Sequence, residues 1–390
     1  MSVRDRLVPG SRTDRTALGV WLLSRIAILA TTTVGAGLLA AGGQLDGFRT
    51  RWTRWDTSLL IEIAQYGYGG NPAEKADPGL PAFFPGFPLL LRAVHAVVPD
   101  WTIAAMLITL AASAVSLVAL ARLGEFTGPD GTGRWATLAL VLSPPAVFLF
   151  AGYTESLFLA FALPAWLLAR RGRWEWAVVC AALASSVRIT GLFLALALIV
   201  EFVTQAVRAR RATDDTGGET GDGRGWPVSR WTLLAVPFLP LVAYSLYLYT
   251  RTGDLTAWLA AQKAGWGREM VGPWKALSTT WDAAFYVNNE FTWSFRAELV
   301  AAAVGVALTV LLAVRRRWPE FVYIGTQVGA LITSSFYLSI PRSALLWWPL
   351  WLLLGRLGAR HRWGFAVYAA VAGPLMIVYV LTFTKGAWAG

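Results

Sequence analysis

The stretch FFPGFPLLLRAVHAVV, residues 83–98, decides how this chain is threaded through a membrane. It is apolar enough for a spanning helix, but it contains two prolines, Arg92 and His95. The arginine clusters elsewhere resolve the ambiguity, because Lys and Arg concentrate in cytoplasmic loops. If residues 83–98 do not cross, the arginine clusters all fall on one side, whereas a crossing would move every later cluster to the other side. We therefore predict a helix that lies in or dips into the outer surface.

Composition indicates an integral membrane protein. Of the 390 residues, 56% are hydrophobic and 15% are charged, and the mean hydropathy is +0.51. A soluble domain cannot bury that much apolar surface. The net charge of +11 also occurs in nucleic-acid-binding proteins, but here the arginines sit in short clusters between apolar runs, so no nucleic-acid partner is expected.

About 20 apolar residues are needed to cross the hydrocarbon layer. The rule that places basic loops inside also divides residues 174–207 into a hairpin that turns near Arg188. We expect eleven spans, several of them tilted or broken, with the N-terminus inside. The predicted spans are Ala17–Ala41, Thr102–Leu123, Trp135–Phe150, Glu155–Ala169, Trp174–Val187, Ile189–Val207, Trp231–Thr250, Ala297–Val314, Phe321–Leu338, Ala344–Gly355 and Trp363–Phe383.

The predicted fold class is all-α, a polytopic transmembrane helix bundle that forms one catalytic domain over residues 1–390. Residues 42–100 are expected to be an exoplasmic loop with helices lying along the membrane surface. Residues 251–296 form the second predicted exoplasmic loop. Residues 208–230 are rich in Gly, Thr and Asp and are predicted to be a flexible cytoplasmic linker.

Asp56 is the main candidate catalytic residue. It follows Arg54 and Trp55 and precedes TSLLIEIA, which is apolar enough to lie as a short surface helix. An Asp at that place has an ordinary explanation, since Asp caps helix N-termini by accepting backbone N–H groups. The functional alternative is a general base that takes a proton from an acceptor hydroxyl. One carboxylate suffices for a transfer whose leaving group is a phosphate.

Four segments carry a family resemblance. They are RWDTSLLIEIAQYGY (54–68), AFFPGFPLLLR (82–92), SPPAVFLFAGYTESLFLAF (143–161) and SSVRITGLFLALAL (185–198). Together they resemble the PIG-V family, the GPI mannosyltransferase II proteins and their bacterial relatives. The resemblance implies a glycosyltransferase fold of GT-C type and an inverting transfer of mannose from a polyprenyl-phosphate donor. It also implies a glycolipid or glycan acceptor and a site on the extracytoplasmic face of the inner membrane.

Two motifs depart from the family pattern. The family often has Arg-Ser-Asn-Gly where this chain has Arg188-Ile189-Thr190-Gly191. It often has an aromatic residue after Pro-Arg where this chain has Ser343. Both differences leave the identity of the acceptor open.

Two arginines are candidates for holding the donor phosphate. Arg188 interrupts an apolar stretch, where a charged side chain is by default a functional candidate, although it can also extend to the lipid headgroups. Arg342 follows Pro341 at another predicted outer boundary. Arginine suits the task because its planar fork bonds two phosphate oxygens.

The other candidate substrate-binding residues are Arg54, Trp55, Glu74, Tyr153, Glu155, Trp266 and Arg268. Four of them have an ordinary alternative. Glu155, beside Tyr153, either caps the next helix or points into a cavity. Glu74 is either a solvated loop carboxylate or a ligand for acceptor hydroxyls. Trp266 and Arg268 in the second outer loop either contact lipid or bind substrate.

No cofactor is expected, and no metal site, since there is no Asp-x-Asp pair and the two histidines are far apart. The expected partners are the donor, the acceptor and membrane lipids. Two alternatives remain open: a transporter or lipid flippase, and a non-catalytic assembly subunit. Transporters often carry charged residues near mid-span and paired half-sequences, whereas the unusual polar residues here gather at one predicted face.

Overall fold

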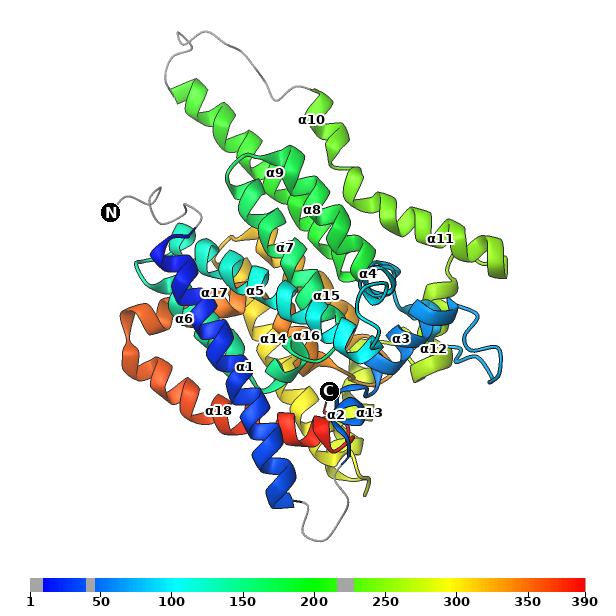
Figure 1. Cartoon of the computed structure of the whole chain (residues 1–390). Coiled ribbons are helices and arrows are strands. Elements are labelled where there is room, and N and C mark those ends of the chain that lie inside the picture. The colour runs from blue at the N-terminus through cyan, green and yellow to red at the C-terminus, as the bar shows by residue number, and fades with distance from the viewer. Residues whose placement is uncertain (1–9, 40–45, 216–227, 390) are drawn as a thin grey trace.

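The computed structural model describes residues 10–39, 46–215 and 228–389. Over these residues the chain is helical, with a single isolated β-bridge between Met270 and Ser334 (Figure 1). The α-helices are α1 (Arg12–Leu39), α2 (Phe48–Trp52), α3 (Asp56–Tyr66), α4 (Gly86–His95), α5 (Trp101–Thr127), α6 (Thr132–Leu142), α7 (Thr154–Arg170), α8 (Trp174–Val187), α9 (Thr190–Asp215), α10 (Val228–Leu233), α11 (Leu239–Thr252), α12 (Ala257–Trp266), α13 (Pro273–Phe285), α14 (Thr292–Val314), α15 (Trp318–Ile332), α16 (Ile340–Ser343), α17 (Trp348–Arg360) and α18 (Arg362–Thr384). Short 3-10 turns are η2 (Leu80–Ala82), η3 (Pro144–Leu149), η4 (Val236–Phe238) and η5 (Ala344–Leu346).

Six helical stretches within the described residues are long and apolar enough to cross a membrane. They are Arg12–Gly35, Trp101–Thr127, Thr190–Arg211, Trp231–Thr252, Thr292–Val314 and Arg362–Thr384. The chain is therefore a multi-pass membrane protein with a helical bundle fold, as predicted. The other predicted spans fall on shorter segments in α6 with η3, α7, α8, α15 and α17, so the count of eleven stays a prediction.

Four predicted spans are not continuous helices. Residues 231–250 are divided among α10, η4 and α11, and residues 344–355 between η5 and α17. The other two interruptions lie near the candidate site. Residues 135–150 are divided between α6 and η3, because Pro144 and Pro145 cannot donate the backbone hydrogen bonds that an α-helix needs. The span predicted over 321–338 ends early, since α15 stops at Ile332. Both interruptions place non-helical backbone close to the candidate site.

Helix α4, which lies within residues 83–98, has ten residues. At 1.5 Å per residue it is about 15 Å long, half of what a hydrocarbon core of about 30 Å requires. It packs against α3, α5 and α8. Gly86 allows the last contact, because a Cβ there would lie 2.7 Å from the backbone oxygen of Ser186.

The core of the bundle is formed where α7 packs on α5, α8 and α9, with α15 against α9 and α17 against α6. Its centre contains large aromatic side chains: Trp348 stacks on Tyr323 at 3.8 Å and lies 5.4 Å from Trp166. Helix α1 crosses the outside of this core over α5 and α6 and meets α18 (Figure 1).

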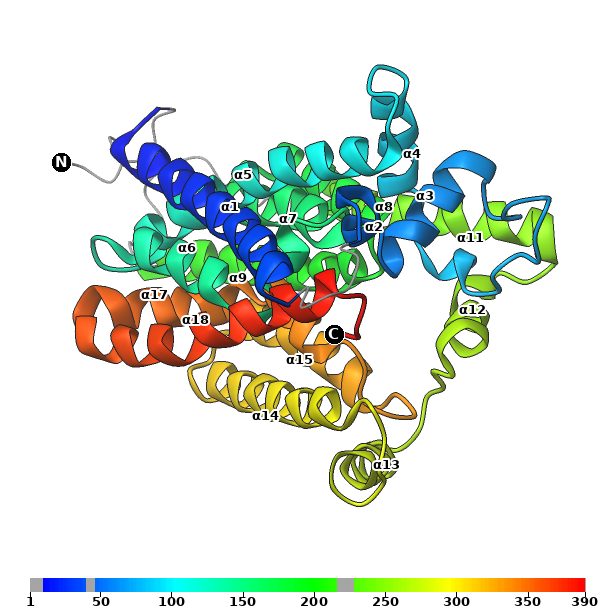
Figure 2. The ribbon, with the colours of Figure 1, turned by 60° about the horizontal axis from the view of Figure 1, so that its bottom comes forward.

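The two predicted outer loops contact each other. Helix α12 packs against η2, and a Cβ on Gly265 would lie 2.8 Å from the Cα of Gly79. Figure 2 shows α12 and α13 extending away from the main bundle on the side where α3 lies. The loops therefore form one layer over that end of the helices.

The predicted linker 208–230 is only partly described. Residues 208–215 are the helical end of α9 and residues 228–230 begin α10. Residues 216–227 lie outside the described residues.

Candidate active site

Four segments converge at one end of the bundle: the start of α3, the beginning of α7, the turn between α8 and α9, and α16. Each contributes one charged side chain to a cluster of Asp56, Glu155, Arg188 and Arg342, called here the charged cluster. These are the residues that the sequence predicted to be the catalytic base, a cavity carboxylate and the two phosphate-binding arginines.

Asp56 faces Arg342. Nη1 of Arg342 lies 2.9 Å from Oδ2 of Asp56, and each side chain is 13% exposed. Asp56 is the first residue of α3, whose N-cap is Trp55 and has no side-chain capping bond. The capping alternative for Asp56 is therefore wrong, and the carboxylate is directed at a guanidinium.

Glu155 joins the two arginines. Its Oε1 lies 2.7 Å from Nη1 of Arg188 and 3.2 Å from Nε of Arg342. The same Nη1 of Arg188 donates to Oγ1 of Thr154 at 2.5 Å. Glu155 is fully buried, and its Oε2 has no hydrogen-bond partner. The N-cap of α7 is Tyr153, and Glu155 lies in the first turn of that helix, where the helix dipole also favours its carboxylate.

Arg342 rests on aromatic rings. Its guanidinium carbon lies 5.6 Å from the ring centroid of Phe148 and 5.4 Å from that of Tyr153, within the range of cation–π attraction. Burial lowers the pKa of Arg342, but the charges of Asp56 and Glu155 outweigh it and hold the pKa above its ordinary value. Burial also raises the pKa of Tyr153 well above its usual range. Tyr153 therefore acts as a neutral donor, and its hydroxyl bonds the carbonyl of Arg54 at 3.2 Å.

Unusual backbone conformations precede both partners of the Asp56–Arg342 pair. Trp55 has φ of 51° and Ser339 has φ of 62°. Positive φ is uncommon for residues other than glycine and costs energy, so it persists only where surrounding structure imposes it. Trp55 is held by edge-on contact with Trp388, with ring centroids 5.2 Å apart. These turns direct the starts of α3 and α16 toward each other.

Gly152 in the AGY motif permits the approach of α3. A Cβ there would lie 2.7 Å from Cβ of Ala105 and 3.0 Å from Cγ2 of Thr57. Thr57 is buried next to Asp56, and its hydroxyl donates to the carbonyl of Gly152 at 3.3 Å. The absence of a side chain at Gly152 thus brings Asp56 beside α7.

Glu298 was not predicted from the sequence. It is buried in α14, and its carboxylate accepts from the backbone N–H of Ser339 at 2.6 Å and of Ile340 at 2.8 Å. It therefore holds the start of α16 and, with it, Arg342. The sequence carried a signal, since an acidic residue within an apolar helix is costly and usually has a specific role.

Of the outer-loop candidates, Arg268 belongs to the neighbourhood of the charged cluster. It donates to the carbonyl of Leu338 at 3.0 Å. Burial lowers the pKa of Arg268 to about 10, with Glu298, Arg342, Arg188 and Asp56 all close enough to influence it. Trp266 instead packs edge-on against Phe83, with ring centroids 5.6 Å apart. It joins the second outer loop to the first.

Three predicted residues are not brought into the charged cluster by a side-chain contact. The Arg54 side chain pairs with Asp46. Trp55 packs on Trp388. Glu74 is exposed, and its Oε1 accepts from the side-chain amide of Asn71 at 3.3 Å. For Glu74 the observed contact is that of a loop carboxylate.

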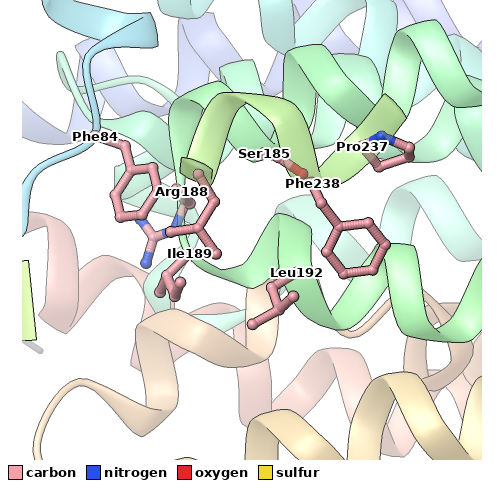
Figure 3. Close-up of a pocket in the computed structure, with 8 residues that line it drawn as sticks. Phe84, Ser185, Arg188, Ile189, Leu192, Pro237 and Phe238 are labelled. Atoms are coloured by element: carbon pink, nitrogen blue, oxygen red, sulfur yellow. The ribbon is translucent and has the colours of Figure 1, made fainter. Parts of the chain in front are cut away.

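A narrow apolar crevice opens next to Arg188 (Figure 3). It has no space for a water molecule in this structure, and it is lined by Phe84, by the α8–α9 turn with the start of α9, and by η4 and α11. Figure 3 shows the Arg188 side chain between Phe84 and Ile189, with Leu192 and Phe238 further along. One arginine of the charged cluster thus borders a groove lined by hydrocarbon.

No group of three or more His, Cys, Asp or Glu side chains that could hold a metal ion occurs in the part of the chain that the structure describes.

Comparison with known proteins yields partial matches. No protein-family model matches the chain. It is similar to the GPI alpha-1,6-mannosyltransferase 2 of Cricetulus griseus, at 32% identity over 160 residues, which is 38% of this chain and 31% of that protein. The protein of the same name from Mus musculus is 32% identical over 169 residues, covering 40% of this chain and 33% of its own length.

The chain thus spans about a third of the length of the curated relatives it matches. Over that part, the resemblance predicted from the sequence motifs is confirmed.

Proposed function

We propose that this protein is a membrane mannosyltransferase. It moves mannose from a polyprenyl-phosphate carrier to a lipid-linked or glycan acceptor on the extracytoplasmic face, with inversion at the transferred carbon. The observation that carries the proposal is the contact of Asp56 with Arg342 in a cluster that also holds Arg188 through Glu155. The relatives' printed name, a GPI alpha-1,6-mannosyltransferase, supports the sugar.

The proposed chemical step is a single displacement. An acceptor hydroxyl oxygen attacks the anomeric carbon of mannose, and its proton passes to the carboxylate of Asp56. The bond from that carbon to the phosphate oxygen breaks, and polyprenyl phosphate leaves with the electron pair. Because attack and departure occur on opposite faces of the sugar, the configuration inverts.

Arg188 and Arg342 are proposed to hold the donor phosphate. Each is a permanent cation with several N–H donors, and the bonds of Arg188 described above engage its Nη1 atom. Fixed guanidinium groups stabilise the charge that develops on the phosphate as the bond breaks. Arg268, close to the same charges, is a third candidate contact.

The crevice beside Arg188, which is closed in this structure, is proposed to open and admit the prenyl chain. Its lining is largely hydrocarbon, with Phe84, Ile189 and Leu192 near the guanidinium. A lipid phosphate requires a cation beside an apolar groove, and this is the arrangement at the α8–α9 turn. The two outer loops cover the same end of the bundle and are proposed to receive the acceptor.

The site is proposed to face the extracytoplasmic side of the inner membrane. The charged cluster lies at the α3 end of the bundle, whereas basic residues such as Arg171, Arg315 and Arg360 follow the opposite ends of α7, α14 and α17. Since basic loops stay in the cytoplasm, that arrangement supports an outward-facing Asp56.

The test is transfer by purified protein supplied with polyprenyl-phosphate mannose and a total lipid extract, comparing wild type with Asp56→Asn. Removal of a general base is expected to reduce transfer by roughly 100-fold or more. Glu74→Gln is the matched control, since it changes an exposed carboxylate in the same loop, and it should transfer normally. Thermal unfolding in detergent checks that both variants are folded. Normal transfer by a folded Asp56→Asn protein would refute the assignment.

A further inference from the structure

A second, larger groove lies far from the charged cluster. It has a volume of about 430 Å³ and runs between α1, α5 and α7. Apolar side chains such as Leu18, Val115 and Leu168 line most of it, and Arg122, Arg171 and Arg173 lie along the same groove. Its size is within the usual range of ligand sites, about 300–1,000 Å³.

The groove belongs to the opposite end of the bundle from Asp56. Thr102, at the start of α5, bonds Thr53 of the first outer loop at 2.6 Å. Arg122 stands twenty residues further along the same helix, which is about 30 Å at 1.5 Å per residue. That distance is the thickness of a hydrocarbon core, so the arginines of this groove are at the other surface of the membrane.

The three arginines differ in their partners. Arg122 is bound by the Asp14 carboxylate through two bonds of 2.8 and 2.6 Å. Arg171 rests on the ring of Phe126 at 5.8 Å, and its Nη2 is buried without a hydrogen-bond partner. Among the described residues, no acidic side chain pairs with Arg171 or Arg173.

Arg170, which precedes Arg171 in the sequence, does have an acidic partner. Its Nη1 lies 3.3 Å from a carboxylate oxygen of Glu201. Arg171 has neighbours of its own sign instead. Burial lowers the pKa of the Arg171 guanidinium, and the charges of Arg122 and Arg173 lower it further. An anion placed between Arg171 and Arg173 would offset the repulsion between these like charges.

We propose that this groove binds an anionic phospholipid from the cytoplasmic leaflet. One acyl chain lies along the apolar wall formed by α1, α5 and α7, and the phosphate is bonded by Arg171 and Arg173. Charge complementarity identifies the ligand: the wall is hydrocarbon, and the polar end carries two guanidinium groups without a described acidic partner. A zwitterionic lipid would bring a second cation to this end, whereas phosphatidylglycerol brings a net negative charge. The inference is independent of the proposed transfer reaction.

The experiment measures lipid binding to the purified full chain by native mass spectrometry, with phosphatidylglycerol and phosphatidylcholine at equal concentration. Wild type is expected to retain phosphatidylglycerol several-fold better. The double variant Arg171→Gln, Arg173→Gln should lose that preference. Arg360→Gln, Arg362→Gln is the matched control, because it removes two exposed charges from the turn between α17 and α18. It should bind as wild type does.

A third variant separates the groove from general surface charge. Val115 is 49% exposed on the groove wall, so Val115→Trp obstructs the groove, leaves every arginine in place and need not disturb the core. It should also weaken phosphatidylglycerol binding. Each preparation is checked for folding by thermal unfolding. Equal binding of both lipids by wild type, full binding by the folded arginine variant, or full binding by folded Val115→Trp would each overturn the proposal.

Discussion

Glu155 is the residue on which the geometry of the charged cluster depends most. It is fully buried and contacts both Arg188 and Arg342, so one carboxylate positions two cations that would otherwise repel each other. A buried ion pair contributes little net stability compared with apolar residues of the same shape, but removing one partner leaves an uncompensated charge. Glu155 is therefore a positioning residue in the proposed reaction.

Replacing Glu155 by Gln is expected to destabilise the protein. The side chain keeps its shape but loses its charge, which leaves two guanidinium groups without their shared partner and costs roughly 3 kcal/mol or more. Thermal or denaturant unfolding in detergent measures the effect.

Glu269→Gln serves as the control. Glu269 also pairs with a cation, Lys263 at 2.6 Å, but both side chains are exposed. Exposed pairs contribute about 1 kcal/mol at most. Equal stability of the two variants would show that the Glu155 contacts are not energetically important.

At the scale of elements, the cluster depends on breaks between helices. The charged residues occur where helices start or end: Asp56 begins α3, Glu155 lies in the first turn of α7, Arg188 ends α8 and Arg342 lies in the short α16. Helix ends leave backbone groups free and allow sharp turns. The α8–α9 turn is short, because α9 begins at Thr190, three residues after α8 ends.

Gly191 makes that turn possible. A Cβ at this position would lie 2.3 Å from the Cα of Ser185, and backbone atoms cannot move aside without reshaping the turn. Gly191→Ala should therefore destabilise the protein by about 1–3 kcal/mol or more, which is the usual cost of overpacking. It should also displace Arg188 and reduce transfer. Unfolding and transfer assays measure the two effects.

Gly19→Ala in α1 is the matched substitution, since a Cβ there would meet no atom within 4 Å. Alanine in an open helical position is expected to be neutral or stabilising by about 0.5–1 kcal/mol. Should Gly191→Ala behave in the same way, the close approach of α8 and α9 would not be a constraint on the fold.

At the scale of the whole molecule, the distribution of charge is the basis for the proposed orientation in the membrane. Basic side chains gather at the end that carries the lipid groove, while the charged cluster and both outer loops occupy the other end. Within the cluster, Asp56 and Glu155 balance Arg188 and Arg342. The acidic and basic side chains of the charged cluster therefore compensate each other, whereas the opposite end of the bundle has an excess of positive charge.

The orientation can be tested by labelling with a membrane-impermeant maleimide. The chain has one cysteine, Cys180, so a Cys180→Ala background is free of thiols. On this background, Glu74→Cys is expected to be labelled in intact cells, and Arg360→Cys only after the membrane is permeabilised, because basic loops stay inside. The reverse pattern would place Asp56 in the cytoplasm and exclude the proposed donor side.

Much of the fold could be predicted from the sequence, because hydropathy and helix breaking are local properties. The apolar runs predicted α1, α5, α9, α14 and α18, and the loop pattern predicted the surface helix that became α3. Local patterns did not reveal that Pro144 and Pro145 divide a predicted span into α6 and a 3-10 turn, since prolines are tolerated within many membrane helices.

By itself the sequence determined that the chain is a helical membrane protein. It singled out Arg188 as a charge within an apolar stretch, and Asp56 and Arg342 as charges at predicted outer boundaries. Charge in an apolar segment is costly wherever the segment lies, so this information needs no fold. Only the tertiary structure decided that Asp56 faces Arg342, that Glu155 bridges the two arginines, and that Glu298 holds α16. These contacts join segments far apart in the chain, and their geometry depends on how closely the helices pack, which no single segment specifies.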